Sequence, residues 1–253
     1  MALPRVAVLC GTGMSILADE LSALGDSTTS NLLIHSEWGP VQASLVSFTV
    51  GEVLVIDRHQ SEEAIRAPPH EIEHRANVYA ASSCKPDLVM SINSVGSMIE
   101  DLPPGTVGVT SDVLDLALRP WTFHDDNAVH TDRTSPFDAS AMTICCTSLK
   151  TTQGSAPSGV VVAQCVGPQF ESIAEIDALE RLGAHAVGMT LGPESRLLSE
   201  TGTPHVSLVC SSNWAAGREP GDPSAQIDHH SVEAIASTMR LHVTECLLSL
   251  LGT

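Results

Sequence analysis

Residues 6–14 read Val6-Ala7-Val8-Leu9-Cys10-Gly11-Thr12-Gly13-Met14. Five apolar residues in a row are typical of a strand that is buried on both of its faces. The glycines then permit a tight turn, and a helical pattern runs from Met14 to Leu24. A glycine turn before a helix can bring backbone N–H groups close to an anion. The same stretch is also typical of a plain strand-to-helix turn, since no third glycine completes a dinucleotide-binding motif.

This alternation of strand and helix continues along the chain. Strand patterns cover Val6 to Cys10, Ala43 to Val50, Val53 to Asp57, Leu88 to Asn93, Val107 to Thr110, Val160 to Val166, Ala186 to Met189 and Val206 to Cys210. Helical patterns cover Met14 to Leu24, His70 to Ser82, Phe137 to Leu149, Glu171 to Leu182, Glu194 to Glu200 and His229 to Leu251. They predict a single α/β domain over residues 1–253, with a central mixed β-sheet flanked by helices on both faces.

Composition excludes several classes of function. Thirty acidic residues against twelve basic ones give a net charge of -18, which repels nucleic acid. Lys85 and Lys150 are the two lysines, so a pocket for an anion must use arginine, histidine and backbone N–H groups. No apolar run is long enough to span a membrane, and no signal peptide precedes the first strand pattern. The seven scattered cysteines are typical of reduced thiols, so we expect a cytoplasmic protein.

Polar residues follow several of the predicted strands, at the edge where α/β proteins bind ligands. These residues are Thr12, Arg58 with His59, Asn93 with Ser94, Met189 with Thr190, and Asn213. Their recurrence at strand ends predicts one composite site. The planar fork of an arginine suits phosphate, although an Arg-His pair taken alone is more often solvated surface.

Glu171 and Asn213 carry the most specific chemistry in the chain. An ionised carboxylate only accepts hydrogen bonds, whereas an amide both donates and accepts them. Together they can bind a ring edge that has an N–H donor and a carbonyl acceptor. Hypoxanthine and guanine have such an edge, and adenine, with its exocyclic amine, does not.

A different reading starts from His70-Glu71-Ile72-Glu73-His74. This spacing matches a helical zinc site in which two histidines share a face and a glutamate acts as base. A third ligand is not apparent, and acidic residues in a first helical turn are ordinary. We therefore expect no metal, with a zinc hydrolase as the rival of another reaction class.

The motifs, in this order, resemble the purine nucleoside phosphorylase and methylthioadenosine phosphorylase family, in its trimer-forming branch. The resemblance covers nearly the whole chain. Its most specific parts are Gly167-Pro168-Gln169-Phe170-Glu171 and Gly183-Ala184-His185-Ala186-Val187-Gly188-Met189-Thr190. Further matches are Gly11-Thr12-Gly13-Met14, Arg58-His59, Pro68-Pro69-His70, and Phe123-His124-Asp125 after Arg119-Pro120. The short chain and the last of these resemble the methylthioadenosine phosphorylase subfamily.

The resemblance implies cleavage of purine nucleosides by phosphate, without a metal or an organic cofactor. It implies a homotrimer or a dimer of trimers that works in purine salvage. Phosphate would be bound by Thr12, Arg58, His59, Asn93, Ser94 and Thr190. The nucleoside would contact Phe170, Glu171, Met189, Asn213 and His229, with His130 entering from a neighbouring subunit. Among these, Asn213, Glu171 and His59 would carry the catalysis.

The base site implied by the resemblance is of the 6-oxopurine type. Adenine-specific members of the family have aspartates in the segment that here contains Asn213 and Ala215, and they lack the glutamate at position 171. We therefore expect inosine and guanosine as substrates. Alternatives are 5′-methylthioinosine or 5′-methylthioadenosine, because His229 favours a 5′-hydroxyl only if it faces the sugar. A non-catalytic nucleoside-binding protein is the alternative of another class.

Overall fold

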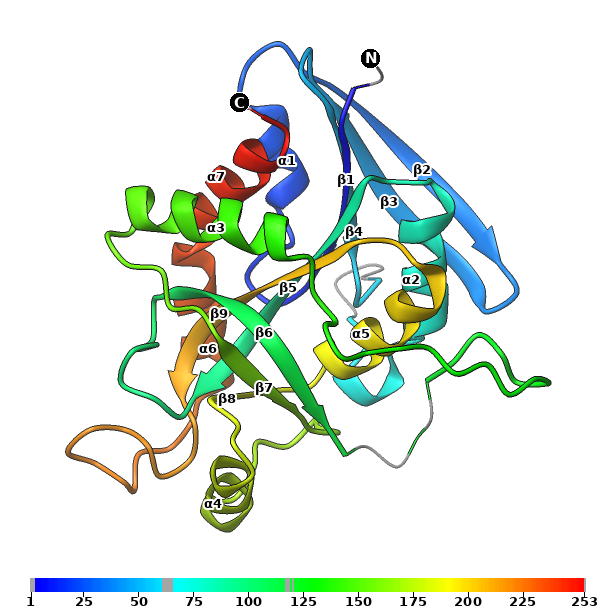
Figure 1. Cartoon of the computed structure of the whole chain (residues 1–253). Helices are drawn as coiled ribbons and strands as arrows, with labels where there is room; N and C mark the ends of the chain where they lie inside the picture. The colour runs from blue at the N-terminus through cyan, green and yellow to red at the C-terminus, as the bar shows by residue number, and fades with distance from the viewer. Residues whose placement is uncertain (1–2, 61–65, 117–118, 120, 253) are drawn as a thin grey trace.

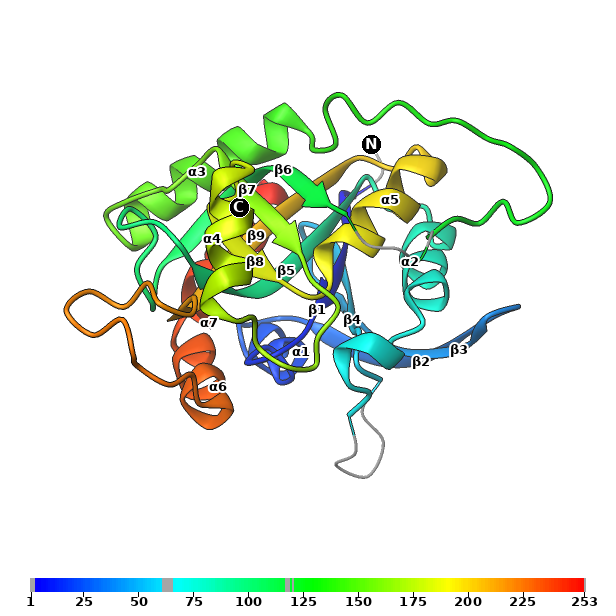
Figure 2. The ribbon, with the colours of Figure 1, turned by 90° about the horizontal axis from the view of Figure 1, so that it is seen from below.

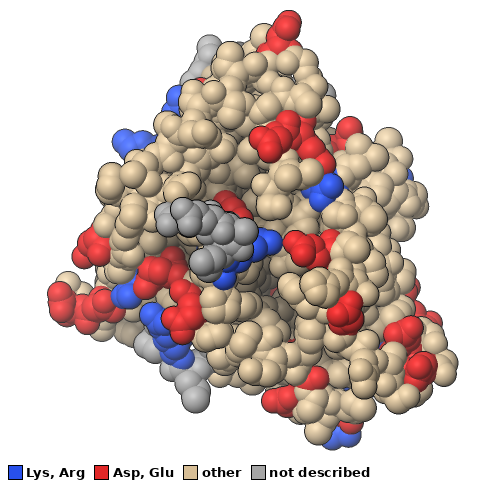
Figure 3. All heavy atoms as spheres, turned by 180° about the vertical axis from the view of Figure 1, so that it is seen from behind, with Lys and Arg blue, Asp and Glu red and all other residues tan. Residues whose placement is uncertain are grey.

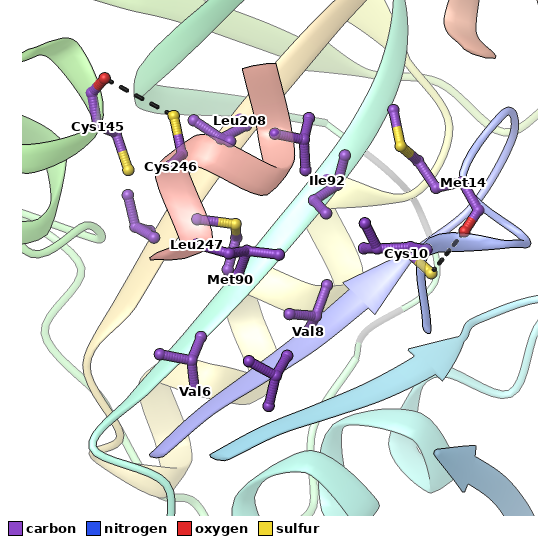
Figure 4. Close-up of a cluster of buried hydrophobic side chains, with 14 of the residues drawn as sticks. Val6, Val8, Cys10, Met14, Met90, Ile92, Cys145, Leu208, Cys246 and Leu247 are labelled. Atoms are coloured by element: carbon purple, nitrogen blue, oxygen red, sulfur yellow. Dashed lines mark hydrogen bonds between the residues drawn. The ribbon is translucent and has the colours of Figure 1, made fainter. Parts of the chain in front are cut away.

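The first strand, β1 (Arg5–Cys10), is buried on both faces, as its sequence predicts. In this computed structural model, which describes residues 3–60, 66–116, 119 and 121–252, it lies inside one large sheet. Val6, Val8 and Cys10 point into a core cluster that includes sulfur atoms of several cysteines and methionines (Figure 4). Ala7 and Leu9 point into a second cluster on the opposite face. A continuous apolar run is thus needed to fill both sides.

The sheet is mixed and has nine strands in the described part of the chain. The other strands are β2 (Thr28–Ser36), β3 (Gly39–Ser47), β4 (Glu52–Asp57), β5 (Leu88–Ser97), β6 (Val107–Asp115), β7 (Val160–Gln164), β8 (Ala186–Gly188) and β9 (His205–Trp214). Their order is β2-β3-β4-β1-β5-β8-β7-β6-β9, and β9 also pairs with β5. The last five strands in this order therefore close into a ring, which the sequence did not predict.

Helices cover both faces of the sheet, as predicted (Figure 1). They are α1 (Leu17–Ser22), α2 (His74–Ser83), α3 (Ala139–Thr152), α4 (Ile173–Arg181), α5 (Leu191–Thr201), α6 (His229–Thr238) and α7 (Arg240–Leu250), with a short 3-10 helix at Pro69–Glu71. On one face α3 packs against α7, and on the other α2 packs against α5. Seen from below, the β2–β3 hairpin and the segment before α3 project away from this body (Figure 2).

Two sequence-based boundaries are wrong in ways that matter for the site. The predicted helix from His229 to Leu251 is two helices, α6 and α7, that are separated at Met239. Strands β5 and β9 continue past the predicted ends at Asn93 and Cys210, so Ser94 and Asn213 lie within strands.

Strand β2 was not predicted, because most of its residues are exposed and its apolar pattern is weak.

The surface agrees with the acidic composition. Acidic side chains are spread over the face shown in Figure 3, and the basic ones do not form a continuous area. Among the helices of the described residues, none combines the length and the apolar character that crossing a membrane requires.

Candidate functional site

One cavity of about 390 Å³ collects nearly all of the residues that the sequence singled out. Thr12, Arg58, His59, Ser94, Phe170, Glu171, Met189, Thr190, Asn213 and His229 line it. Asn93 and His130 are not part of this lining. The side chains come from the ends of β1, β4, β8 and β9, from the middle of β5, from the loop between β7 and α4, and from the start of α6. The prediction that they converge on one composite site is therefore consistent with the fold.

Gly11, at the end of β1, is needed because Arg58 lies directly against it. A Cβ atom at this position would lie 2.5 Å from Arg58 Nη1 and 3.2 Å from His59 Nε2. Gly13 has a φ of +78°, and a Cβ there would lie 2.5 Å from the Cβ of Ala236 on α6. The glycines of this turn thus serve close packing of Arg58 and of α6 around Thr12.

Arg58 is held in a fixed orientation by the protein itself. Its Nε donates to Glu194 Oε1 at 2.6 Å, and its Nη2 donates to the Leu9 carbonyl at 2.8 Å. Its Nη1 donates to the Ile92 carbonyl at 2.9 Å. The Arg58 side chain is 2% exposed and that of Glu194 is 0% exposed. The guanidinium therefore meets the cavity as a pre-oriented donor whose charge is already paired.

His59 is a neutral acceptor at physiological pH. Its Nδ1 lies 2.7 Å from the Ala67 carbonyl, which can only accept, so Nδ1 carries the proton. Burial, supported by the nearby charge of Arg58, lowers the pKa of His59 to about 4, although its hydrogen bond to Ala67 acts in the opposite direction. The Nε2 lone pair is then available to accept from a hydroxyl or from a protonated phosphate oxygen.

Asn93 acts behind the cavity wall and not on it. Its Oδ1 accepts from the Thr190 hydroxyl at 2.9 Å, and its Nδ2 donates to Ser207 Oγ at 3.3 Å. Thr190 itself lines the cavity at the start of α5, where backbone N–H groups favour an anion. Asn93 therefore orients Thr190.

The loop between β7 and α4 brings Phe170 and Glu171 to the cavity. The peptide bond between Gly167 and Pro168 is cis, and Gly167 has a φ of +68°. A Cβ at Gly167 would lie 2.5 Å from the sulfur of Met189. A glycine is therefore required for Met189 to lie against this loop. Ser172 then begins α4 through a capping box with Glu175.

Glu171 is half-buried, and this burial raises the pKa of its carboxyl. A hydrogen bond with the thiol of Cys165 acts in the opposite direction. The carboxylate is thus partly removed from water before any ligand arrives, which strengthens a hydrogen bond to a ligand N–H group.

Asn213 lies on β9 beside a bulge in the β5–β9 pair. Val95 is paired with Ser211 and Gly96 with Asn213, so Ser212 is the extra residue. The Asn213 Nδ2 donates to the Trp214 carbonyl at 2.8 Å, and its Oδ1 accepts from Ser212 Oγ at 3.0 Å. Gly96 leaves room for this amide, since a Cβ there would lie 3.1 Å from Nδ2.

His229, on the first turn of α6, lines the cavity and is exposed. The cavity lining also includes the apolar residues Ile227, Val232, Pro68 and Pro69. His130 is exposed in the segment before α3. His130 therefore does not line the cavity of its own chain. Its expected role requires that it enter the cavity of a neighbouring subunit.

The histidines of the zinc-like motif do not share one helix. His70 lies in the 3-10 helix Pro69–Glu71, whereas His74 begins α2. His74 is 1% exposed and its ring packs edge-on against Trp121 at 5.0 Å. The shared helical face that such a zinc site requires is therefore not formed.

Sequence reasoning missed three polar residues that belong to the site. Glu194 pairs with Arg58, and Ser212 contacts Asn213. Arg66 lines the cavity. Its Nη2 lies 3.5 Å from Asp57 Oδ1, and its Nη1 lies 3.7 Å from Glu233 Oε1. Nothing in the local pattern around Glu194 distinguishes it from a solvated helical glutamate. Ser212 was adjacent to Asn213 in the motif, and its position could have been noticed there.

Known proteins show which family has this fold and sequence. The family described as the phosphorylase superfamily matches residues 5–248. A probable S-methyl-5′-thioinosine phosphorylase of Methanosarcina acetivorans is 37% identical over 185 residues, covering 73% of this chain and 70% of that protein. A probable 6-oxopurine nucleoside phosphorylase of Thermococcus kodakarensis is 29% identical over 236 residues, covering 86% and 82%.

A solved structure agrees on the fold. Methylthioadenosine phosphorylase from Schistosoma mansoni in complex with adenine superimposes with a TM-score of 0.84 over 98% of this chain and 91% of that one, at 20% identity. The family match and the sequence relatives, together with this agreement of fold, confirm the family resemblance inferred from the motifs. The chain belongs to the phosphorylase superfamily, and it is an enzyme of the purine nucleoside phosphorylase family.

Proposed function

We propose that this enzyme cleaves 6-oxopurine nucleosides, inosine and guanosine, with phosphate, and releases the free base and ribose 1-phosphate for purine salvage. The observation that supports this most directly is the presence of Glu171 and Asn213 on the same cavity as Arg58 and His59. Glu171, an acceptor, and Asn213, a mixed donor–acceptor group, suit the 6-oxopurine edge. Arg58 as a donor and His59 as an acceptor from a protonated phosphate oxygen suit phosphate.

The reaction proceeds in one displacement at C1′ of the ribose. As the C1′–N9 bond breaks, its electron pair moves to the purine and the ribosyl ring approaches an oxocarbenium ion. A phosphate oxygen on the opposite face stabilises that cation and then forms the new bond to C1′. Thr12, Arg58, Ser94, Thr190 and neutral His59 hold the phosphate, and holding both reactants in line supplies much of the acceleration.

The leaving base is stabilised by its edge contacts. Asn213 donates to the purine carbonyl or N7 as negative charge builds there, so this contact is stronger in the transition state than in the ground state. Glu171 accepts from N1–H, while Phe170 and Met189 contact the base and the sugar. No metal or organic cofactor takes part in this scheme. An adenine edge would leave buried polar groups unpaired, at a cost of about 1–3 kcal/mol each.

A second candidate substrate is 5′-methylthioinosine, with the same base site. Besides His229, the cavity lining contains Ile227, Val232, Pro68 and Pro69, which suit an apolar 5′ group. The relative from Methanosarcina acetivorans carries the name of such an activity. His229 instead favours a 5′-hydroxyl, through a hydrogen bond from its ring.

The test measures base release from inosine, guanosine, adenosine, 5′-methylthioadenosine and 5′-methylthioinosine, each with and without phosphate. Phosphate-dependent release from inosine and guanosine supports the proposal. Release from 5′-methylthioinosine alone supports the second candidate and retains the base site. Binding of hypoxanthine without turnover of any nucleoside would support a non-catalytic role. We also propose a cytoplasmic homotrimer or dimer of trimers in which His130 completes a neighbouring site.

A further inference from the structure

Two serine hydroxyls connect strand β5 to the Asn213 amide on the cavity wall. Ser94 Oγ donates to Ser212 Oγ at 2.7 Å, and Ser212 Oγ donates to Asn213 Oδ1 at 3.0 Å. Ser94 comes from β5 and lines the cavity next to Asn93, while Ser212 and Asn213 come from β9. The three side chains thus form a continuous hydrogen-bonded row across the β5–β9 pair.

The bulge at Ser212 makes this row possible. In a regular strand, neighbouring side chains point to opposite faces, so Ser212 and Asn213 would not both line one cavity. Because Ser212 is the extra residue between the pairs Val95–Ser211 and Gly96–Asn213, the strand bends there. Bulges redirect side chains in this way beside active sites.

The contacts at its two ends determine which way the Asn213 amide faces. The Trp214 carbonyl can only accept, so the Nδ2 group must face it. The Oδ1 atom then faces Ser212, whose single hydroxyl proton can reach Asn213 Oδ1 at 3.0 Å or the Val95 carbonyl at 3.3 Å, and the shorter contact is the one to Asn213. If the amide were turned over, Oδ1 would lie against the Trp214 carbonyl, and the Ser212 proton would keep only the longer contact with the Val95 carbonyl. One Nδ2 hydrogen remains to meet a ligand.

We infer that Ser212, supported by Ser94, is a positioning residue that makes the enzyme prefer 6-oxopurines. The inference rests on the proposed function. In the observed orientation the amide donates to a carbonyl at C6 of the base. In the turned orientation it would offer an acceptor to the 6-amino group of adenine. Ser212 therefore acts on specificity through Asn213, without contacting the base.

The experiment compares kcat/KM for inosine and adenosine in five variants at saturating phosphate, so that a weakened phosphate site does not change the ratio. Ser212→Ala is expected to lower the inosine-to-adenosine ratio by about tenfold, since the loss of a hydrogen bond to a buried acceptor has about that effect. Ser212→Thr keeps the hydroxyl and should keep the ratio. Ser94→Ala removes the supporting donor, and we expect a smaller decrease of about threefold.

Ser211→Ala is the matched control. Ser211 is the preceding residue on β9, is equally buried, and donates to the Leu102 carbonyl at 2.9 Å. Its variant should lose stability and keep the ratio. The double variant Ser94→Ala with Ser212→Ala should resemble Ser212→Ala alone, because Ser94 acts on Asn213 only through Ser212.

Two results would overturn the inference. An unchanged ratio in Ser212→Ala would show that the Trp214 carbonyl alone fixes the amide. An equal decrease in Ser211→Ala would show that any loosening of β9 relaxes specificity. A wild-type enzyme that releases base from none of the five nucleosides would instead refute the proposed function, and the inference with it. The wild-type assay therefore separates the two failures.

Discussion

Arg58 Nε and Glu194 Oε1 lie 2.6 Å apart in a position where neither side chain is more than 2% exposed. The pair joins the end of β4 to α5 across 136 residues of sequence. Removal of one partner from a buried pair leaves the other charge without compensation, whereas exposed pairs have little effect. The orientation of Arg58, which lines the cavity, therefore depends on a residue that does not itself line it.

Arg58→Ala should affect stability and phosphate use together. We expect the free energy of unfolding to fall by about 3–5 kcal/mol, because Glu194 is left buried and unpaired. The apparent affinity for phosphate should fall more than the affinity for hypoxanthine. Urea unfolding and phosphate titrations measure the two effects.

Two further variants separate the effect on stability from the effect on phosphate use. Arg218→Ala removes exposed pairs with Asp177 and Glu180 and should cost less than about 1 kcal/mol. Arg58→Met with Glu194→Leu replaces the pair by apolar groups and should recover stability without phosphate use. Full phosphate dependence in Arg58→Ala would remove Arg58 from the proposed site.

Asn213→Asp combined with Ala215→Asp should shift preference from inosine toward adenosine. Ala215 is 3% exposed and lines the cavity, so an aspartate there meets the ligand. Carboxylates accept from a 6-amino group and repel a 6-carbonyl. The ratio of kcat/KM for the two nucleosides measures the shift. An unchanged ratio in a folded variant would contradict the assignment of the base end.

Gly167→Ala should lower kcat/KM by at least about tenfold, because its Cβ would displace Met189 from the cavity wall. Gly183→Ala is the matched control, since Gly183 also has a positive φ, of +94°, and no atom lies within 4 Å of its added Cβ. Both variants carry backbone strain of about 1–2 kcal/mol. Equal activity in the two would show that Met189 does not need this contact.

The stability of the enzyme should decrease in mild acid because of buried histidines. Burial lowers the pKa of His59 to about 4 and the pKa values of His74 and His205 to about 3. In the unfolded chain these groups take up protons near pH 6.5, so their contribution is complete above that pH. It is lost as the pH falls from 6.5 toward 3.

Each of these histidines adds up to about 1.4 kcal/mol per pH unit to that loss. Urea unfolding between pH 7.5 and pH 4.5 measures the slope. His74→Phe should reduce it, since phenylalanine fills the position against Trp121 without titrating. His124→Gln, at an exposed position, should not reduce it. A flat profile for the wild type would contradict this account.

Oligomerisation should be required for full activity. His130 is exposed and does not line the cavity of its own chain, so its predicted role needs a neighbouring subunit. Light scattering should give three or six chains per particle. His130→Ala should lower kcat/KM by about tenfold, whereas His124→Ala, in the same segment, should not. A fully active monomer would refute the shared site.

The sequence predicted what local patterns can encode. Strand β1 was evident because all of its residues from Val6 to Cys10 are apolar, and the helices were evident from their periodicity. The pairing of β9 with both β5 and β6 was not evident from the sequence, because ring closure depends on contacts between residues far apart in sequence. Strand β2 was missed because a mostly exposed hairpin does not need an apolar run.

The candidate site shows the same limit. Arg58, Glu171 and Asn213 were recognisable from residue type and motif. Glu194 was not, because its importance comes entirely from its partner 136 residues away. Asn93 was predicted to bind phosphate, and in the structure its side chain accepts a hydrogen bond from Thr190. The spacing of residues in the sequence does not distinguish a side chain that contacts Thr190 from one that contacts a ligand.

The interruption at Met239 divides the C-terminal region into two helices that tolerate amino-acid substitution to different degrees. Helix α7 buries Val243, Cys246 and Leu247 in the main core, so its substitutions are constrained by packing. Helix α6 places His229 and Val232 on the cavity. Under the proposed function, the group accepted at the 5′ position can therefore change through His229 and Val232, while Ala236 of α6 and the core residues of α7 are inherited intact.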